Sequence, residues 1–325
     1  MTATRHIVAA GLGEVLFDCD TESGACTFGG APANFAYHFL RCASLLAPDA
    51  QIESHVVSAI GTDADGRPDA WGERVLDELA RRGLGAELTR VKSLPTGLVD
   101  KRRDAAGVNT YEILPGAWDA LVWAPETQQL AGRCDVVCFG SLAQRRAATH
   151  AVVCRFLDEM IASGRPTLRV FDVNIRQNYY SRGVIEESIR RCNILKISDE
   201  EAPSVAACLT GRPLAGDAET LCRDLLAAHP RLGTVILTEG GEGSRIFTRT
   251  QTVCYRIPAS ERVKPVDTVG AGDSFTGAYC AMTLLGGDPA AAQRFASKVA
   301  AFVCSRESAT PDYPADVREL FLNQK

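Results

Sequence analysis

The sequence predicts an α/β fold in which helices cover both faces of a largely parallel sheet. Short apolar runs bounded by turns alternate with longer amphipathic stretches, which is the pattern of βαβ units. A chain of 325 residues, 46% of them hydrophobic, can bury one large core or two smaller ones. Because the chain has no internal repeat, low-complexity tract or linker, we predict a single domain over residues 1–325.

The predicted elements follow one another in order along the chain. Six apolar runs are predicted strands: residues 7–10, 56–60, 136–139, 168–171, 194–197 and 235–238. Five amphipathic stretches between them are predicted helices: residues 34–46, 71–82, 149–163, 184–191 and 220–228. Two segments, residues 14–33 and 95–118, fit the alternation poorly because they mix short period-two strands with turns.

Polar residues follow three of the predicted strands. In open parallel sheets, binding sites lie at the carboxyl ends of the strands, so functional groups are expected there. The polar residues are Asp172, Asn174 and Arg176 after one strand, residues 198–201 after another and residues 238–243 after a third.

Residues 267–275 combine a glycine turn, a helix start and one carboxylate. Gly270 and Gly272 lack the Cβ atoms that would keep an anion from the backbone, and residues 274–285 are apolar at helical spacing. The first amides of such a helix lack internal partners and favour negative charge. Asp273 beside them suggests a base that takes a proton from an attacking hydroxyl. Judged alone, the motif favours an N-capped buried helix after a tight turn.

The same stretch resembles the signature of the ribokinase-like (PfkB) carbohydrate kinases. Residues 28–36 resemble the glycine-pair segment that approaches the sugar in these enzymes. With further matching segments, the resemblance covers nearly all of residues 5–315, and the opening motif from Gly13 to Leu16 is most similar to bacterial fructokinases. The resemblance implies a ribokinase-like three-layer α/β/α sandwich, in which residues 14–33 and 95–118 form a small β-sheet lid.

The resemblance also implies the transfer of the γ-phosphate of ATP to a sugar hydroxyl. Asp273 would be the general base, and backbone amides, chiefly of Gly270, Ala271 and Gly272, would hold the transferring phosphoryl group. The chain has neither a Gly-x-x-x-x-Gly-Lys-Ser/Thr loop nor a His-Arg-Asp catalytic loop. The two commoner kinase classes are therefore excluded.

By the same resemblance, the sugar-binding residues lie in the lid and next to it. Asp18 would accept hydrogen bonds from two sugar hydroxyls, and Asn34 would supply an amide to a hydroxyl. Gly29 and Gly30 would let the backbone reach the sugar, and Arg176 would contact substrate or phosphate. From the residues alone, Asp18 also fits a turn and Arg176 a surface ion pair.

The nucleotide and Mg²⁺ sites are implied at the ends of later strands. Thr238, Gly240 and Gly243 resemble the nucleotide-side loop, although this glycine-rich sequence is also typical of a turn between strands. Family members commonly carry Asn-x-x-Glu where this chain has Ser198 and Glu201, so Glu201 would hold Mg²⁺ through water with a hydroxyl replacing the amide. Ser198 and Glu201 also match a helix capping box.

A monovalent cation and a dimer are two further implications. Members of the family often bind such a cation near Asp267 and Val269, but Ser308 stands where a glycine is usual, which leaves activation by K⁺ open. Lid sheets of this kind often pair between subunits, so a homodimer through the lid is compatible with the sequence.

Composition excludes several other classes. A net charge of −5 and a pI near 5.7 argue against nucleic-acid binding. No run approaches the roughly eighteen apolar residues of a membrane span, and the apolar opening has no cleavage-site pattern, so we expect no membrane partner and a cytoplasmic protein. The 12 cysteines are dispersed, mostly within apolar stretches, and are expected to be reduced core residues.

Together these observations predict an ATP-dependent sugar kinase, a phosphotransferase with an alcohol acceptor, acting on a primary hydroxyl of fructose with Mg²⁺. One alternative is a 2-keto-3-deoxygluconate kinase, in which Arg176 and a lid arginine, Arg102 or Arg103, would bind the acid. Another is a different sugar or nucleoside kinase of the family. A third is a catalytically silent binding or regulatory protein, which Ser198 favours and the presence of Asp273 opposes.

Overall fold

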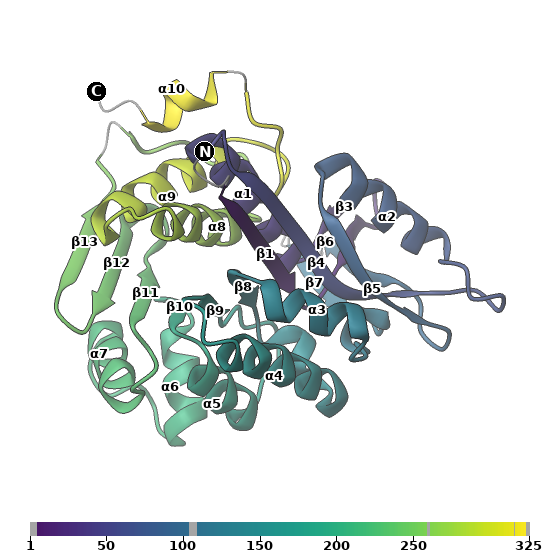
Figure 1. Ribbon diagram of the computed structural model, residues 1–325, viewed down its shortest axis with the longest axis horizontal. Helices are drawn as coiled ribbons and strands as arrows, with labels where there is room; N and C mark the ends of the chain where they lie inside the picture. The colour runs from purple at the N-terminus through teal and green to yellow at the C-terminus, as the bar shows by residue number, and fades with distance from the viewer. Residues whose placement is uncertain (1–4, 104–108, 259–260, 315, 323–325) are drawn as a thin grey trace.

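A computed structural model describes residues 5–103, 109–258, 261–314 and 316–322 of the chain (Figure 1). Within these residues a central sheet of nine strands runs in the order β13 (Thr252–Arg256), β12 (Gly243–Thr248), β11 (Thr234–Thr238), β10 (Ile194–Ser198), β9 (Leu168–Asp172), β8 (Val136–Phe139), β1 (His6–Leu12), β4 (Gln51–Gly61), β5 (Gly85–Val91). Strands β11 to β5 pair in parallel, whereas β12 and β13 are antiparallel at one edge. The predicted, largely parallel sheet is confirmed.

Helices cover both faces of this sheet, as Figure 1 shows. One face packs against α3 (Pro125–Arg133), α4 (Ala147–Ala162), α5 (Arg182–Arg191), α6 (Ala202–Thr210) and α7 (Ala218–Ala228). The other packs against α1 (Ala31–Leu46), α8 (Ala271–Leu284) and α9 (Pro289–Cys304), and α10 (Val317–Leu322) packs against α9. This is the predicted three-layer sandwich. In the described part of the chain, no helix combines the length and the apolar character that crossing a membrane requires.

A second, smaller sheet forms the lid. Among the described residues it has four strands in the order β3 (Cys26–Gly29), β2 (Leu16–Asp20), β6 (Gly97–Arg103), β7 (Asn109–Ile113). The β2 and β6 strands pair in parallel, and the two outer pairings are antiparallel. The aromatic rings of Phe17 and Phe28 lie on the face that packs against α1 and α2 (Ala70–Arg82). Because side chains alternate along a strand, Asp18 points toward the other face.

A disulfide closes the far end of the β2–β3 hairpin. Cys19 and Cys26 are directly opposite each other in the strand register and are covalently bonded. The prediction that the cysteines are reduced is therefore wrong for this pair, while the other ten cysteines are free thiols. The bridge lies in the lid, one residue from Asp18.

Helices α1 and α8 pack unusually closely. A Cβ atom on Gly277 would lie only 2.9 Å from the backbone nitrogen of Phe39, so a larger residue in α8 would force the two helices apart. The C-terminal segment packs against α1, because the hydroxyl of Tyr37 donates to the carbonyl of Pro311 and the ring of His38 contacts the carbonyl of Ala309. This packing places the first turns of α1 and α8 next to each other.

Candidate active site

The first turn of α8 presents backbone amides that have no partner. Its N-cap, Gly270, has a φ of 81°, and a Cβ atom there would lie 2.7 Å from that of Ala309, so glycine is required on both counts. The amide of Ala271 donates to the carbonyl of Thr268 in the preceding turn. Within the described residues, no oxygen accepts from the amides of Gly270, Gly272 and Asp273. Three of the amides at this N-terminus can therefore bind an anion.

Asp273 projects from the same turn toward α1. Its Oδ2 accepts a hydrogen bond from Nδ2 of Asn34 at 2.8 Å, and its Oδ1 accepts none within the described residues. Burial raises the pKa of Asp273 to about 6, and the charge of Asp172 adds to this effect. The hydrogen bond from Asn34 and the positive charges of Lys196 and Arg176 oppose the rise. Asp273 is thus ionised at neutral pH with one free oxygen, as a general base must be.

On the lid, Asp18 occupies the predicted sugar-binding position. A Cβ atom on Gly29 would lie 3.0 Å from Oδ2 of Asp18, so the absence of a side chain on β3 makes room for this carboxylate. Burial raises its pKa to about 6, against the opposing charges of Arg176 and Lys101. Gly30 caps α1 with a φ of 112°, and a Cβ there would lie 2.5 Å from the carbonyl of Glu14. These residues lie near one another where the lid joins α1.

Asn34 and Arg176 reach this place from two other elements. Asn34 is in the first turn of α1 and is 3% exposed, and among the described residues its Oδ1 has no hydrogen-bond partner. Arg176 is exposed in the loop after β9, and it makes no ion pair within 4 Å in the described part of the chain. Its positive charge nevertheless lowers the pKa of Asp18 and Asp273. The structure therefore brings Asp18, Asn34, Arg176 and Asp273 together.

Ser198 and Glu201 form a closed turn between β10 and α6. The backbone amide of Ser198 donates to Glu201 Oε2, and the amide of Glu201 donates to Ser198 Oγ. These are the reciprocal bonds of a capping box, but α6 begins only at Ala202, so they stabilise the turn before the helix. Glu201 Oε1 also accepts from the amide of Ile175 in the loop that carries Arg176. Both carboxylate oxygens are thus held by backbone amides, which suits a Mg²⁺ ligand acting through water.

The other predicted residues lie at the edges of this region. Thr238 ends β11 and Gly240 is exposed in the following turn. Gly243 has a structural reason to be glycine, since a Cβ there would lie 2.0 Å from the carbonyl of Tyr255 on the paired strand. In the loop before α8, Asp267 Oδ1 accepts from the amide of Val269. The structure therefore gives Gly243 and Asp267 local roles, and their roles toward nucleotide and cation stay predictions.

Sequence reasoning missed two charged groups buried beside these residues. Glu14, between β1 and the lid, is 3% exposed, and its Oε2 has no hydrogen-bond partner in the described part of the chain. Burial raises its pKa to about 7. Lys196, on β10, is 6% exposed and its Nζ donates to both carboxylate oxygens of Asp172. For Lys196 the sequence did contain a signal, namely a lysine within an apolar strand. Burying an unpaired ammonium there would be costly, so a buried acidic partner could have been expected.

Comparisons with known proteins agree with this geometry. Residues 18–316 match the family described as pfkB family carbohydrate kinase. A nucleoside kinase of Methanothermobacter thermautotrophicus is 25% identical over 88% of this chain and 81% of its own length. A fructokinase of Rhizobium leguminosarum bv. trifolii is 28% identical over 64% of this chain and 60% of its own length.

The fold agrees as well. A crystal structure of fructokinase with bound ATP from Xylella fastidiosa superposes with a TM-score of 0.75 at 21% identity and covers 94% of both chains. The relatives named above differ in the substrate that their names give, so they leave the acceptor open. The chain belongs to the pfkB family of carbohydrate kinases, whose members are phosphotransferases with an alcohol acceptor.

Proposed function

We propose that this protein is an ATP-dependent fructokinase that phosphorylates a primary hydroxyl of the sugar. The observation that carries the proposal is the hydrogen bond between Asn34 and Asp273, which are separated by 239 residues in the sequence. It joins the helix beside the sugar-binding lid to the helix whose free amides can hold a phosphoryl group. A sugar hydroxyl bound at Asn34 would lie beside the free Oδ1 of Asp273.

In this mechanism Asp273 takes the proton of the attacking hydroxyl. The hydroxyl oxygen forms a bond to the γ-phosphorus of ATP, the bond from that phosphorus to the bridging oxygen breaks, and ADP leaves. The free amides of Gly270, Gly272 and Asp273 donate to the oxygens of the transferring group. A base with a pKa of about 6 is ionised at neutral pH and still accepts a proton readily.

The sugar would be held from the lid side. Asp18 accepts hydrogen bonds from two hydroxyls, and Gly29 and Gly30 leave space for the sugar next to the backbone. Arg176, which has no carboxylate partner in the described structure, is available to the substrate or to a phosphate oxygen.

On the nucleotide side, Mg²⁺ bound with ATP would offset the charge of the phosphates. Glu201 would hold the ion through water, with the Ser198 hydroxyl in place of an amide, and Thr238 and Gly240 would lie along the nucleotide. Activation by K⁺ near Asp267 and Val269 belongs to the same proposal, as does a homodimer through the lid. Assays with and without K⁺ test the first, and sedimentation velocity tests the second.

A second candidate is a 2-keto-3-deoxygluconate kinase. The guanidinium of Arg176 favours it, because such a substrate carries a carboxylate, and among the described residues Arg176 has no acidic partner and donates only to the carbonyl of Ile175. Arg102 is a weaker candidate for this role, since it donates to Asp100 at 2.9 Å and lies 4.0 Å from Glu112. The side chain of Arg103 lies outside the described residues. Fructokinase activity therefore remains our first proposal, and Arg176 is the one arginine that favours a keto-acid substrate.

The test is ADP release with Mg-ATP against fructose, 2-keto-3-deoxygluconate, ribose, adenosine and tagatose, with and without K⁺. Fast turnover on fructose alone is the expected result. Preference for the keto acid would replace the substrate and leave the mechanism in place. Asp273→Asn should lower turnover at least about 100-fold, the scale of a general base, without loss of folding. Near-normal turnover of that variant would remove Asp273 from this role.

A further inference from the structure

A buried ion pair lies directly under the first turn of α8. Lys196 Nζ donates to Oδ1 and Oδ2 of Asp172 at 2.9 and 2.8 Å, and the two residues are 6% and 4% exposed. The hydroxyl of Thr276, in α8, lies within donating distance of Asp172 Oδ2 at 3.2 Å and of the carbonyl of Gly272 at 2.9 Å, and its single proton is shared between these two acceptors. The pair therefore joins β9 and β10 to the helix that carries Asp273.

The ammonium of the pair lies against Gly272, one of the residues whose backbone amide is free within the described residues. A Cβ atom on Gly272 would lie 3.1 Å from Lys196 Nζ, which is tighter than an ordinary contact, so the absence of a side chain lets the ammonium approach this turn. The carboxylate of Asp172 is instead bonded to Thr276, one helical turn further along α8. The ion pair thus points its positive end toward the amides that can hold a phosphoryl group.

Burying such a pair is expensive, because both charges lose water, and packed apolar residues of similar volume often stabilise a fold equally well. An electrostatic use explains the pair better than stability does. Asp172 raises the pKa of Asp273, and Lys196 lowers it. The other groups that face Asp273 are Arg176 and Asn34, which favour the charged form, and Glu14, whose own pKa is raised by the charge of Asp273.

We propose that Lys196 is a positioning residue for phosphoryl transfer: its ammonium, held against Gly272, offsets part of the charge of Asp172 and so helps Asp273 to stay ionised beside an electropositive helix end. The role rests on the proposed function of Asp273 and the α8 amides. It does not require knowledge of the acceptor sugar.

The test uses variants whose effects differ in sign. Lys196→Met leaves the negative charge of Asp172 uncompensated and should raise the pKa of Asp273. Asp172→Asn leaves the positive charge of Lys196 uncompensated and should lower the pKa of Asp273. A unit charge about 10 Å away, at an effective dielectric constant of about 20, changes a pKa by about one unit, which is the expected size of each shift. The double variant should return the pKa close to that of the wild type.

Two readouts follow this pKa. The first is a ¹³C NMR titration of the Asp273 carboxyl in the protein without ligands, assigned with Asp273→Asn. The second is the acid limb of kcat/KM for the sugar that gives turnover. If Lys196→Met does not fold, the expected decrease in the pKa of Asp273 in Asp172→Asn tests the proposal by itself.

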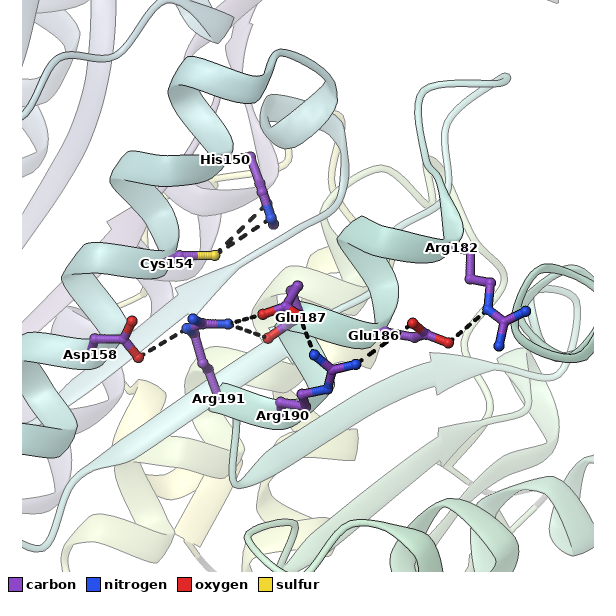
Figure 2. Close-up of polar contacts among 8 residues, drawn as sticks. All are labelled: His150, Cys154, Asp158, Arg182, Glu186, Glu187, Arg190 and Arg191. Atoms are coloured by element: carbon purple, nitrogen blue, oxygen red, sulfur yellow. Dashed lines mark hydrogen bonds and ion pairs between the residues drawn. The ribbon is translucent and has the colours of Figure 1, made fainter.

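Arg191→Met is the matched control. Figure 2 shows Arg191 between Asp158 and Glu187 in an ion-pair network of α4 and α5, the helices that cover the opposite face of the central sheet. This variant also removes a partly buried, ion-paired cation, and it should leave the pKa of Asp273 unchanged.

Opposite shifts in the two single variants support the proposal. An unmoved pKa in the folded variants, together with an inactive Asp273→Asn, would overturn the role of Lys196 and leave the base assignment standing. Such a result would make the pair a purely structural one. Turnover retained by Asp273→Asn would overturn the base assignment and the role of Lys196 with it.

Discussion

Glu14 should make the folded protein less stable as the pH rises from about 4.5 to about 7. Its side chain is 3% exposed, and its Oε2 has no hydrogen-bond partner among the described residues. Burial is the main reason that its pKa rises from 4.5 to about 7, the charge of Asp273 adds to the rise, and Arg176 and nearby backbone amides oppose it. Between these two pH values the folded state therefore holds a proton that the unfolded chain has released.

The sign and size of the effect follow from proton linkage. A carboxyl with a raised folded pKa contributes stability that is fully present below its unfolded pKa and is lost as the pH rises through its folded pKa. Here the loss falls between about pH 4.5 and pH 7. At about 1.4 kcal/mol per pH unit, this range corresponds to roughly 3 kcal/mol of unfolding free energy.

Glu14→Gln keeps the shape of the protonated side chain and cannot ionise. The variant should match the wild type below pH 4.5 and be more stable by roughly 3 kcal/mol at pH 8. Urea unfolding of both proteins at the two pH values measures the difference, since other titrating groups are common to both. Glu200→Gln is the control, because it makes the same substitution at an exposed position. A stability difference for Glu14→Gln that does not change between the two pH values would refute the reasoning.

Three further predictions concern the site and the lid. Asn34→Ala removes the hydrogen bond to Asp273, and a hydrogen bond to a charged group contributes about 1.5–3 kcal/mol. The acid limb of kcat/KM should therefore move up from about pH 6 by roughly one pH unit. A pH–rate profile in which this limb does not move would contradict the prediction. Asp18→Ala should raise the KM for sugar at least about tenfold and leave ATP affinity intact in initial-rate assays, because a lost bond to a carboxylate costs at least about 1.4 kcal/mol; unchanged sugar KM would remove Asp18 from the sugar site. Cys19→Ser removes a disulfide whose cysteines have a sequence separation of 7, so the chain-entropy relation gives a loss of about 2.5 kcal/mol in unfolding free energy. Urea titration without reductant measures this loss, and equal stability of the two proteins would mean that the disulfide contributes nothing to the stability of the fold.

Much of the fold could be predicted because the buried parallel strands form continuous apolar runs. The run at 194–197 became β10 with almost the same bounds, Ile194–Ser198. Boundaries were less certain where a special residue begins an element. The helix expected from residue 34 begins at Ala31, because Gly30 at positive φ caps it and Pro32 fits its first turn. The long start of β4 was missed because its exposed end carries polar residues.

The candidate site was predictable only as far as motifs carry it. The glycines and acids of the two motifs could be predicted as site residues because the motifs resemble those of a known family, whereas the motif around Asp273, judged alone, favours a capped helix. The pairing of Lys196 with Asp172 could not, because it depends on two parallel strands placing residues 24 positions apart side by side. The disulfide likewise depends on the register of β2 against β3, which the turn between them sets. Sequence spacing contains no information about such lateral neighbours.

The contact between Asn34 and Asp273 also bears on when the protein becomes active during its synthesis. The two residues are 239 positions apart, and the segment that supports α1 and Gly270 from the other side, around Ala309 to Pro311, is made later still. A ribosome-bound chain can complete β1 and the lid strands early, whereas Asp273 and the amides of the first turn of α8 are made 239 residues after Asn34. A chain interrupted before α8 would therefore carry the lid strands without the proposed base and the proposed anion-binding amides.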